Sequence, residues 1–196
     1  MKLEFWFEFA STYSYLTAMR LPDEAAKRGI EVTWRPFLLG PIFAAQGLET
    51  TPFLVYPMKG RYLLRDMDRR ARALGLEFYL PDTFPQNGLL AARVATAALP
   101  DPAGMRFCQN VYQAEFAHGQ TIADPDVVAR CAKDAGLDAE ILDRAQTDPV
   151  KQALRATTEE ALSRGIFGAP SFTVGDELFW GDDRLEDAFD WAAKHG

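Results

Sequence analysis

Cysteine is scarce in this chain of 196 residues, and its scarcity limits the chemistry that the chain can perform. The two cysteines, Cys108 and Cys131, are far apart and form no CxxC pair. Dithiol exchange by the chain itself is therefore excluded, since it needs two neighbouring thiols. No disulfide framework is predicted either, and we expect two free thiols in a reducing cytoplasm.

Histidine and positive charge are also in short supply. The two histidines, His118 and His195, lie far apart in the sequence and lack the spacing of metal ligands, so no metal site is predicted. The net charge of −7 is spread along the chain, which argues against nucleic acid as a partner. A basic cluster over residues 59–72 is interrupted by Asp66 and Asp68 and is interpreted mainly as a solvated helix face.

Long hydrophobic runs are missing. The first residues contain Lys2 and a short apolar run, but Glu4 and Glu8 interrupt it, so we expect neither a signal peptide nor a membrane span. The sequence also lacks a glycine-rich phosphate loop and the motif of a serine-hydrolase nucleophile elbow. With 48% hydrophobic residues, the chain has enough apolar side chains for one well-buried core.

The first forty residues have the pattern of a strand, a helix and a strand. Residues 2–9 alternate aromatic side chains with glutamates, and Ser11 and Thr12 then offer the hydroxyls that start a helix. The helix should run to Gly29 with Tyr15, Leu16, Met19 and Ala26 inward, and Pro22 is expected either to kink it or to split it. Residues 30–34 alternate as a second strand. A helix between two strands predicts a parallel, right-handed crossover.

The middle of the chain, residues 40–148, contains almost no strand signal. Two apolar stripes have helical spacing, one at Leu63, Met67, Ala71 and Leu74 and one at Cys108, Val111, Tyr112 and Phe116. Two Asp-Pro pairs, at residues 124–125 and 148–149, predict capped helix starts for helices that end near Gly136 and Gly165. We therefore predict a helical insertion.

The end of the chain returns to strands. Residues 171–174 and 178–180 read as two strands joined by a Gly175-Asp176 turn, followed by a helix with Leu185, Ala188, Phe189 and Ala192 inward. The predicted fold class is α/β, in the thioredoxin-like order βαβ…ββα with a large all-helical insertion. Its expected domains are residues 1–39 with 149–196, and the insertion at residues 40–148.

Three sequence motifs, in this order along the chain, carry a resemblance to a known family. They are Phe9-Ala10-Ser11-Thr12-Tyr13-Ser14-Tyr15, Gly165-Ile166-Phe167-Gly168-Ala169-Pro170 and Phe179-Trp180-Gly181-Asp182-Asp183-Arg184-Leu185. The chain closely resembles the kappa-class glutathione transferases and the 2-hydroxychromene-2-carboxylate isomerases of the DsbA-like thioredoxin superfamily. This chain departs from the family pattern in two places. At Thr12 the family commonly has proline, and in the segment Thr50-Thr51-Pro52-Phe53 the family often has an asparagine.

The resemblance gives Ser11 the role of the catalytic residue. A thiol near pKa 8.5 is only a few per cent ionised at neutral pH, and a hydroxyl donor at a helix amino terminus favours the thiolate. Ser11 would thus stabilise the sulfur of a bound glutathione. Its position alone equally fits a simple helix cap, and the two roles are compatible.

The other glutathione contacts are also implied by the resemblance. The Ala169–Pro170 bond is expected to be cis, with Pro170 facing Ser11 and the Ala169 backbone pairing with the cysteinyl unit of glutathione. Asp183, with Asp182 as the weaker partner, would take the γ-glutamyl ammonium, or both would be caps in a capping-box pattern with Glu186. Lys59 would take the glycyl or a substrate carboxylate, or it is a surface lysine.

The resemblance implies a cytoplasmic, homodimeric, glutathione-dependent isomerase that acts on 2-hydroxychromene-2-carboxylate or a similar small aromatic compound. Two alternatives stay open, a transferase or peroxidase that consumes glutathione on electrophiles, and a catalytically idle thioredoxin-like binding protein. The insertion should cover one deep cleft over the core, with Phe43, Phe53 and Tyr56 near its entrance or in the core.

Overall fold

Four strands form one mixed sheet in the computed structural model, which describes residues 2–195. Its strands are β1 (Lys2–Phe7), β2 (Glu31–Pro36), β3 (Ser171–Val174) and β4 (Glu177–Trp180), in the order β2-β1-β3-β4. β1 pairs with β2 in parallel, whereas β3 is antiparallel to both β1 and β4. The predicted parallel crossover and the thioredoxin-like order are confirmed.

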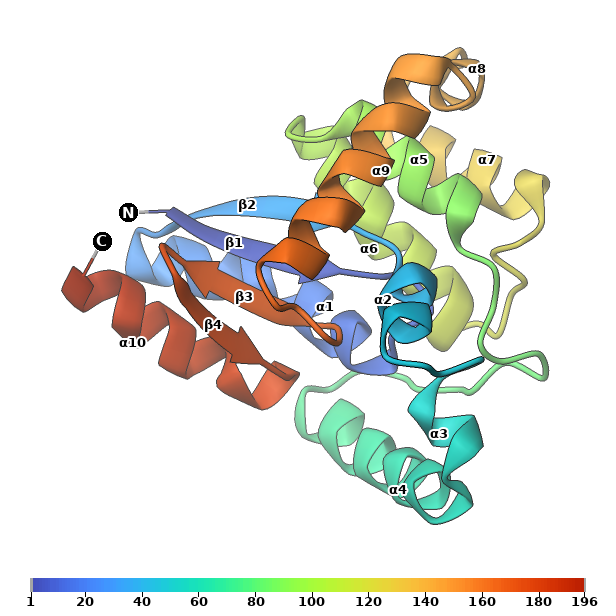
Figure 1. Ribbon diagram of the computed structural model, residues 1–196. Helices are drawn as coiled ribbons and strands as arrows, with labels where there is room; N and C mark the ends of the chain where they lie inside the picture. The colour runs from blue at the N-terminus through green and yellow to red at the C-terminus, as the bar shows by residue number, and fades with distance from the viewer. Residues whose placement is uncertain (1, 196) are drawn as a thin grey trace.

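Helices cover both faces of this sheet (Figure 1). The helical elements of the described chain are α1 (Thr12–Arg28), α2 (Leu39–Ala45), α3 (Pro52–Val55), α4 (Pro57–Ala73), α5 (Leu89–Ala98), α6 (Pro102–Phe116), α7 (Pro125–Ala135), α8 (Ile141–Ala145), α9 (Asp148–Ser163), the 3-10 turn η1 (Asp182–Arg184) and α10 (Leu185–His195). No strand occurs among residues 37–170, so the predicted helical insertion is present. No helix within residues 2–195 is long and apolar enough to cross a membrane.

Alternation along β1 divides the core into two clusters. Leu3, Phe5 and Phe7 face the main cluster, to which α1, α5, α6 and α10 contribute. Trp6 faces the opposite side, in a smaller cluster that includes Phe37 and residues near α2 and α9. The main cluster joins strand and insertion side chains in one continuous core. The domain boundaries at residues 39/40 and 148/149 therefore stay a prediction.

Most of the predicted inward residues are buried, with three exceptions, of which Met19 is partly buried and packs against the main cluster. All four residues of the Cys108 stripe and all four of the last helix are buried. Ala26 is exposed and Ala25 is buried instead, so the predicted inner face of α1 is wrong by one residue at its last turn. Leu74 is 41% exposed because it follows the last residue of α4 and has left the helical stripe.

The predicted helix starts are confirmed at one Asp-Pro pair and corrected at the other. The Asp124 side chain accepts a hydrogen bond from the Asp126 amide and caps α7. Asp148, however, is already the first residue of α9, whose cap position is Thr147 without a side-chain hydrogen bond. The expected capping box at Asp183 and Glu186 is not formed, because Glu186 pairs with Arg20 of α1.

Candidate functional site

A cavity of about 460 Å³ opens beside the start of α1, between the sheet and the helical insertion. Its walls come from the β1–α1 turn, from residues 39–59, from residues 84–86 and from the segment before β3. The expected cleft between core and insertion is therefore present. Its volume lies in the range of small-molecule sites. The residues that line it include Glu8, Ser11, Thr12, Tyr13, Phe43, Gln46, Thr50, Thr51, Phe53, Lys59, Phe84, Gln86, Phe167, Gly168, Ala169 and Trp180.

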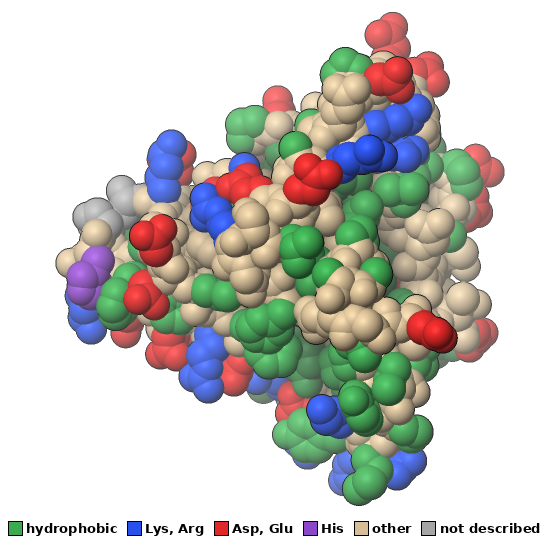
Figure 2. Space-filling view, in the orientation of Figure 1, with side chains coloured by type: hydrophobic (Ala, Val, Ile, Leu, Met, Phe, Trp, Pro, Cys, Tyr) green, Lys and Arg blue, Asp and Glu red, His purple; other side chains and the backbone are tan. Residues whose placement is uncertain are grey.

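Hydrophobic side chains surround the mouth of this cavity. On the face shown in Figure 2 they gather between the end of β4 and the helices α3 and α4. Phe167 and Trp180, both about half exposed, pack with ring centroids 4.9 Å apart on one side. Phe43 and Phe53 line the cavity as expected of entrance residues, whereas Tyr56 does not line it and lies under the Lys59 ammonium.

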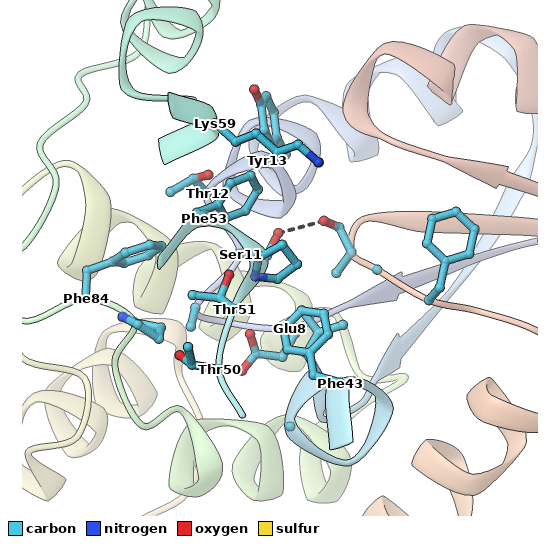
Figure 3. Close-up of a pocket in the computed structure, with 18 of the residues that line it drawn as sticks. Glu8, Ser11, Thr12, Tyr13, Phe43, Thr50, Thr51, Phe53, Lys59 and Phe84 are labelled. Atoms are coloured by element: carbon cyan, nitrogen blue, oxygen red, sulfur yellow. Dashed lines mark hydrogen bonds between the residues drawn. The ribbon is translucent and has the colours of Figure 1, made fainter. Parts of the chain in front are cut away.

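Ser11 lies where the β1–α1 turn meets the segment before β3 (Figure 3). Its hydroxyl donates to the Ala169 carbonyl oxygen at 2.9 Å and accepts from the Ser14 amide at 3.2 Å. Ser11 is therefore the cap of α1 and also touches the residue before Pro170. The Ala169–Pro170 peptide bond is cis, as expected.

Backbone amides beside Ser11 are available to an anion. The amides of Thr12 and Tyr13, the first two of α1, have no hydrogen-bond acceptor within the described chain, and neither has the amide of Ala169. The helix dipole adds a partial positive charge at this end. The turn thus presents free backbone donors beside the Ser11 hydroxyl, among the residues that line the cavity.

Lys59 is the only cation among the lining residues. It lies near the start of α4, with its ammonium 4.7 Å from the centre of the Tyr56 ring. No carboxylate within residues 2–195 forms an ion pair with it, so its charge is available to a ligand. The rest of the basic cluster is solvent-exposed as expected, except for the partly buried Arg70.

Asp182 and Asp183 differ sharply from each other. Asp182 is 2% exposed, and its carboxylate accepts from Thr17, Arg20 and Arg70. It ties α1 and α4 to η1, and neither of its oxygens is left for a ligand. Asp183 is about half exposed and is 3.5 Å from Arg184. Neither aspartate lines the cavity, and neither does Pro170, whereas Ser11, Lys59 and Ala169 do.

The sequence interpretation missed three polar residues of the cavity, Glu8, Gln46 and Gln86. Gln86 is fixed by bonds to Gln120 and Ile122, at 3.0 and 2.7 Å. Burial raises the pKa of Glu8 to about 8, and the Ala10 amide offsets a smaller part of that shift. Glu8 resembled one more outward glutamate of an alternating strand. Its place at the carboxyl end of β1, three residues before Ser11, was the available signal.

Comparisons with known proteins match nearly the whole chain. The family description "DSBA-like thioredoxin domain" matches residues 2–190. A 2-hydroxychromene-2-carboxylate isomerase of Sphingobium xenophagum is 30% identical over 185 residues, which cover 94% of each chain. Human glutathione S-transferase kappa 1 is 27% identical over 200 residues, covering 94% of this chain and 87% of its own. A solved 2-hydroxychromene-2-carboxylate isomerase has a TM-score of 0.89 at 22% identity, covering 99% of this chain and 95% of its own.

Proposed function

This chain belongs to the DSBA-like thioredoxin domain family, and from that premise we propose that it is a glutathione-dependent isomerase of 2-hydroxychromene-2-carboxylate or a similar aromatic-derived compound. The observation that carries the proposal is the contact between Ser11 and Ala169 at the cavity wall. It joins a hydroxyl, a helix amino terminus and the backbone segment that precedes β3 in one place. A thiol-bearing peptide needs these three groups.

Glutathione fits the donors that the cavity presents. Ser11 and the Thr12 and Tyr13 amides would hold its sulfur, and the Ala169 backbone would pair with its cysteinyl unit. Lys59 would hold its glycyl carboxylate. Asp183 would pair with the γ-glutamyl ammonium from outside the cavity, with Asp182 keeping η1 in place. Thr50 or Thr51 would substitute for the asparagine that the family often has nearby.

When bound, glutathione supplies a thiolate nucleophile that adds reversibly to a conjugated carbon of the substrate. The Ser11 hydroxyl has one proton to donate, and without a ligand it donates that proton to Ala169. If the cysteinyl amide of bound glutathione donates to the Ala169 carbonyl oxygen, it replaces the Ser11 hydroxyl as the donor to that oxygen. Ser11 is then free to turn its proton to the sulfur while it still accepts from the Ser14 amide.

The proposal also covers the cellular compartment, the substrate and the partners of the protein. Free, buried Cys108 and Cys131 are compatible with a reducing cytoplasm, which also supplies glutathione. The name of the Sphingobium relative supports a small aromatic substrate. Neither nucleic acid nor a membrane is part of the proposed function.

Calorimetric titration with reduced glutathione tests the binding half of the proposal. We expect one site per chain and an affinity that falls roughly tenfold in Lys59→Met, since one charge-assisted contact of about 1.5 kcal/mol is lost. The matched control is Arg61→Met, an exposed arginine of the same helix that does not line the cavity. If the wild-type protein binds no glutathione, the proposed function is wrong.

Product analysis tests the catalytic half. The expected result with 2-hydroxychromene-2-carboxylate is an isomerised product with glutathione fully recovered. Glutathione consumed by a conjugatable electrophile, with no isomerisation, would instead identify a transferase. Binding without either reaction would identify a thioredoxin-like binding protein.

A further inference from the structure

Glu8 is the only carboxylic acid among the residues that line the cavity. Its main chain is fixed from two sides, because its carbonyl oxygen accepts from the Ser11 amide and from the Tyr112 hydroxyl, each at 3.0 Å. These bonds hold the main chain of Glu8 at a constant position relative to Ser11. In the view of Figure 3, Ser11 lies between Lys59 on one side and Glu8 with Phe43 and Thr50 on the other.

The surroundings of Glu8 favour its protonated form. No cation pairs with its carboxyl group within residues 2–195. The titratable groups that face it belong to α6 and are Tyr112 and Glu115, and the other titratable groups of the cavity are Tyr13 and Lys59. Glu115 is wholly buried, and neither of its carboxyl oxygens has a hydrogen-bond partner within the described chain.

Two neighbouring carboxyl groups in an apolar environment hold protons more tightly than either would alone in water. Burial and the Glu8 charge raise the pKa of Glu115 well above its usual range, so its proton stays bound. Glu8 has access to the cavity and a pKa of about 8, so it can lose and regain its proton near neutral pH. Of the two, only Glu8 can pass a proton to a bound molecule.

We propose that protonated Glu8 is a catalytic residue that donates its proton to the carbonyl oxygen of a conjugated carbonyl substrate. The inference rests on the proposed function and deepens it by naming the residue that supplies the proton. Ring opening of a 2-hydroxychromene-2-carboxylate, which is a cyclic hemiketal, gives a ketone conjugated with an alkene and an aromatic ring. Such a compound has the carbonyl oxygen that Glu8 would meet.

The proton transfer balances without an oxidant or a reductant. As the nucleophile bonds to the alkene carbon remote from the ketone, the alkene electron pair shifts and charge develops on the carbonyl oxygen. That oxygen takes the Glu8 proton, so the O–H bond of Glu8 breaks and a new O–H bond forms on the substrate. The former double bond is then single and can rotate. On reversal the nucleophile leaves, the double bond returns, and the proton goes back to Glu8.

The pH dependence of turnover tests the inference in Glu8→Gln. In the wild-type protein, kcat/KM should fall as the pH rises through about 8, because Glu8 of the free protein is then ionised and cannot donate. Glu8→Gln should lower kcat by roughly a hundredfold or more and remove this alkaline fall. Glutathione affinity should not change, since glutamine imitates the neutral acid in shape. Glu8→Asp should restore part of kcat together with the alkaline fall.

A matched control and a second measurement complete the test. Glu4→Gln changes a glutamate of the same strand that pairs with Arg164 outside the cavity, and it should keep both kcat and the alkaline fall. Infrared titration of the free protein should show a protonated carboxyl band that disappears near pH 8 and is missing in Glu8→Gln. This measurement needs neither glutathione nor turnover.

The outcomes separate the inference from the proposed function. Wild-type kcat and an alkaline fall in Glu8→Gln would overturn the role of Glu8 and leave the isomerase proposal in place. If the alkaline fall is lost in Glu115→Gln but kept in Glu8→Gln, the donated proton belongs to Glu115. That result would also overturn the role of Glu8. Loss of glutathione binding in Glu8→Gln would make Glu8 a binding group. If the wild-type protein binds no glutathione, both proposals fail.

Discussion

At the scale of single residues, Glu115 is a buried carboxyl group whose two oxygens have no hydrogen-bond partner within the described chain. A buried carboxyl group without a hydrogen-bond partner is costly, and it persists as the neutral acid because ionisation would cost more. A residue that lowers stability in this way is expected where function benefits from it. Its neighbour Glu8, at the cavity wall, supplies that function in our proposal.

Glu115→Gln should stabilise the protein in a pH-dependent way. The pKa of Glu115 is raised in the folded state, so the folded protein keeps a proton that the unfolded chain releases above about pH 4.5. The free energy of unfolding contributed by this group is fully present below pH 4.5 and falls as the pH rises toward the folded pKa. Glutamine does not titrate. We expect wild type and variant to be similar near pH 4.5, and the variant to be more stable by over about 1 kcal/mol at pH 8.

Urea unfolding at pH 4.5 and pH 8 measures this difference. An equal difference between variant and wild type at both pH values would mean that Glu115 is not protonated in the folded protein.

The candidate site was partly predictable from single residues. Ser11, Lys59 and Ala169 were predicted from motifs and meet at one cavity, because the turn after β1 and the segment before β3 are neighbours in the sheet. Asp182 is instead a buried contact of two arginines, which a sequence pattern of two adjacent aspartates cannot distinguish from a ligand contact. Glu8 was missed because alternation in β1 marks it as outward-facing.

At the scale of elements, α1 is continuous through Pro22, so the split that was one of the two predicted alternatives does not occur and the kink stays a prediction. Proline has no amide proton, so the Ala18 carbonyl oxygen loses its usual helical donor. The side-chain amide of Gln109, on α6, donates to that oxygen at 3.0 Å. A long-range side chain thus satisfies the carbonyl that the proline leaves free, and no local pattern could have predicted it.

Gln109→Ala should therefore destabilise the protein by about 1–3 kcal/mol, the cost of an unsatisfied carbonyl. In a Pro22→Ala background the same change should cost less, because the residue at position 22 again supplies an amide. A double-mutant cycle by urea unfolding measures this coupling. Equal costs in the two backgrounds would show that Gln109 does not compensate for Pro22.

A second prediction for the elements concerns Asp182 and Asp183, which are adjacent at the junction of α1, α4 and η1. Asp182→Asn should lower the free energy of unfolding by about 3 kcal/mol, because Arg20 and Arg70 lose a buried partner. Asp183→Asn, at an exposed site, should change stability by less than about 0.5 kcal/mol and should weaken glutathione binding instead. Urea unfolding and calorimetry on both variants decide this. Unchanged glutathione affinity in Asp183→Asn would remove Asp183 from the binding site.

At the scale of the whole molecule, periodicity and order of elements predicted most of the fold. Alternating strands and the helical stripes of α6 and α10 have strong signals because each buries one face. Residues 39–56 contain two short helices with few buried side chains, and their place over the cavity depends on tertiary contacts rather than on a local pattern.

The expected homodimer belongs to this scale and stays a prediction. Exposed apolar side chains are concentrated in α3, α4 and the residue between them, at Leu54, Val55, Tyr56, Met58, Tyr62 and Leu64. An exposed apolar patch favours association. Sedimentation velocity at micromolar concentration should therefore give the mass of two chains. A single monomer peak would refute the dimer without affecting the fold or the site.

The central claim is that Ser11 and the start of α1 hold glutathione as a thiolate, and the pKa of the bound thiol tests it most directly. Thiolate absorbance of bound glutathione, followed against pH, should give a pKa at least about one unit below the ordinary value near 8.5. Ser11→Ala should raise that pKa by about one to two units, since a hydrogen bond to a charged acceptor is worth about 1.5–3 kcal/mol. Asp124→Ala removes a distant helix cap and should leave it unchanged. A wild-type pKa equal to that of free glutathione, or equal values in wild type and Ser11→Ala, would contradict the claim.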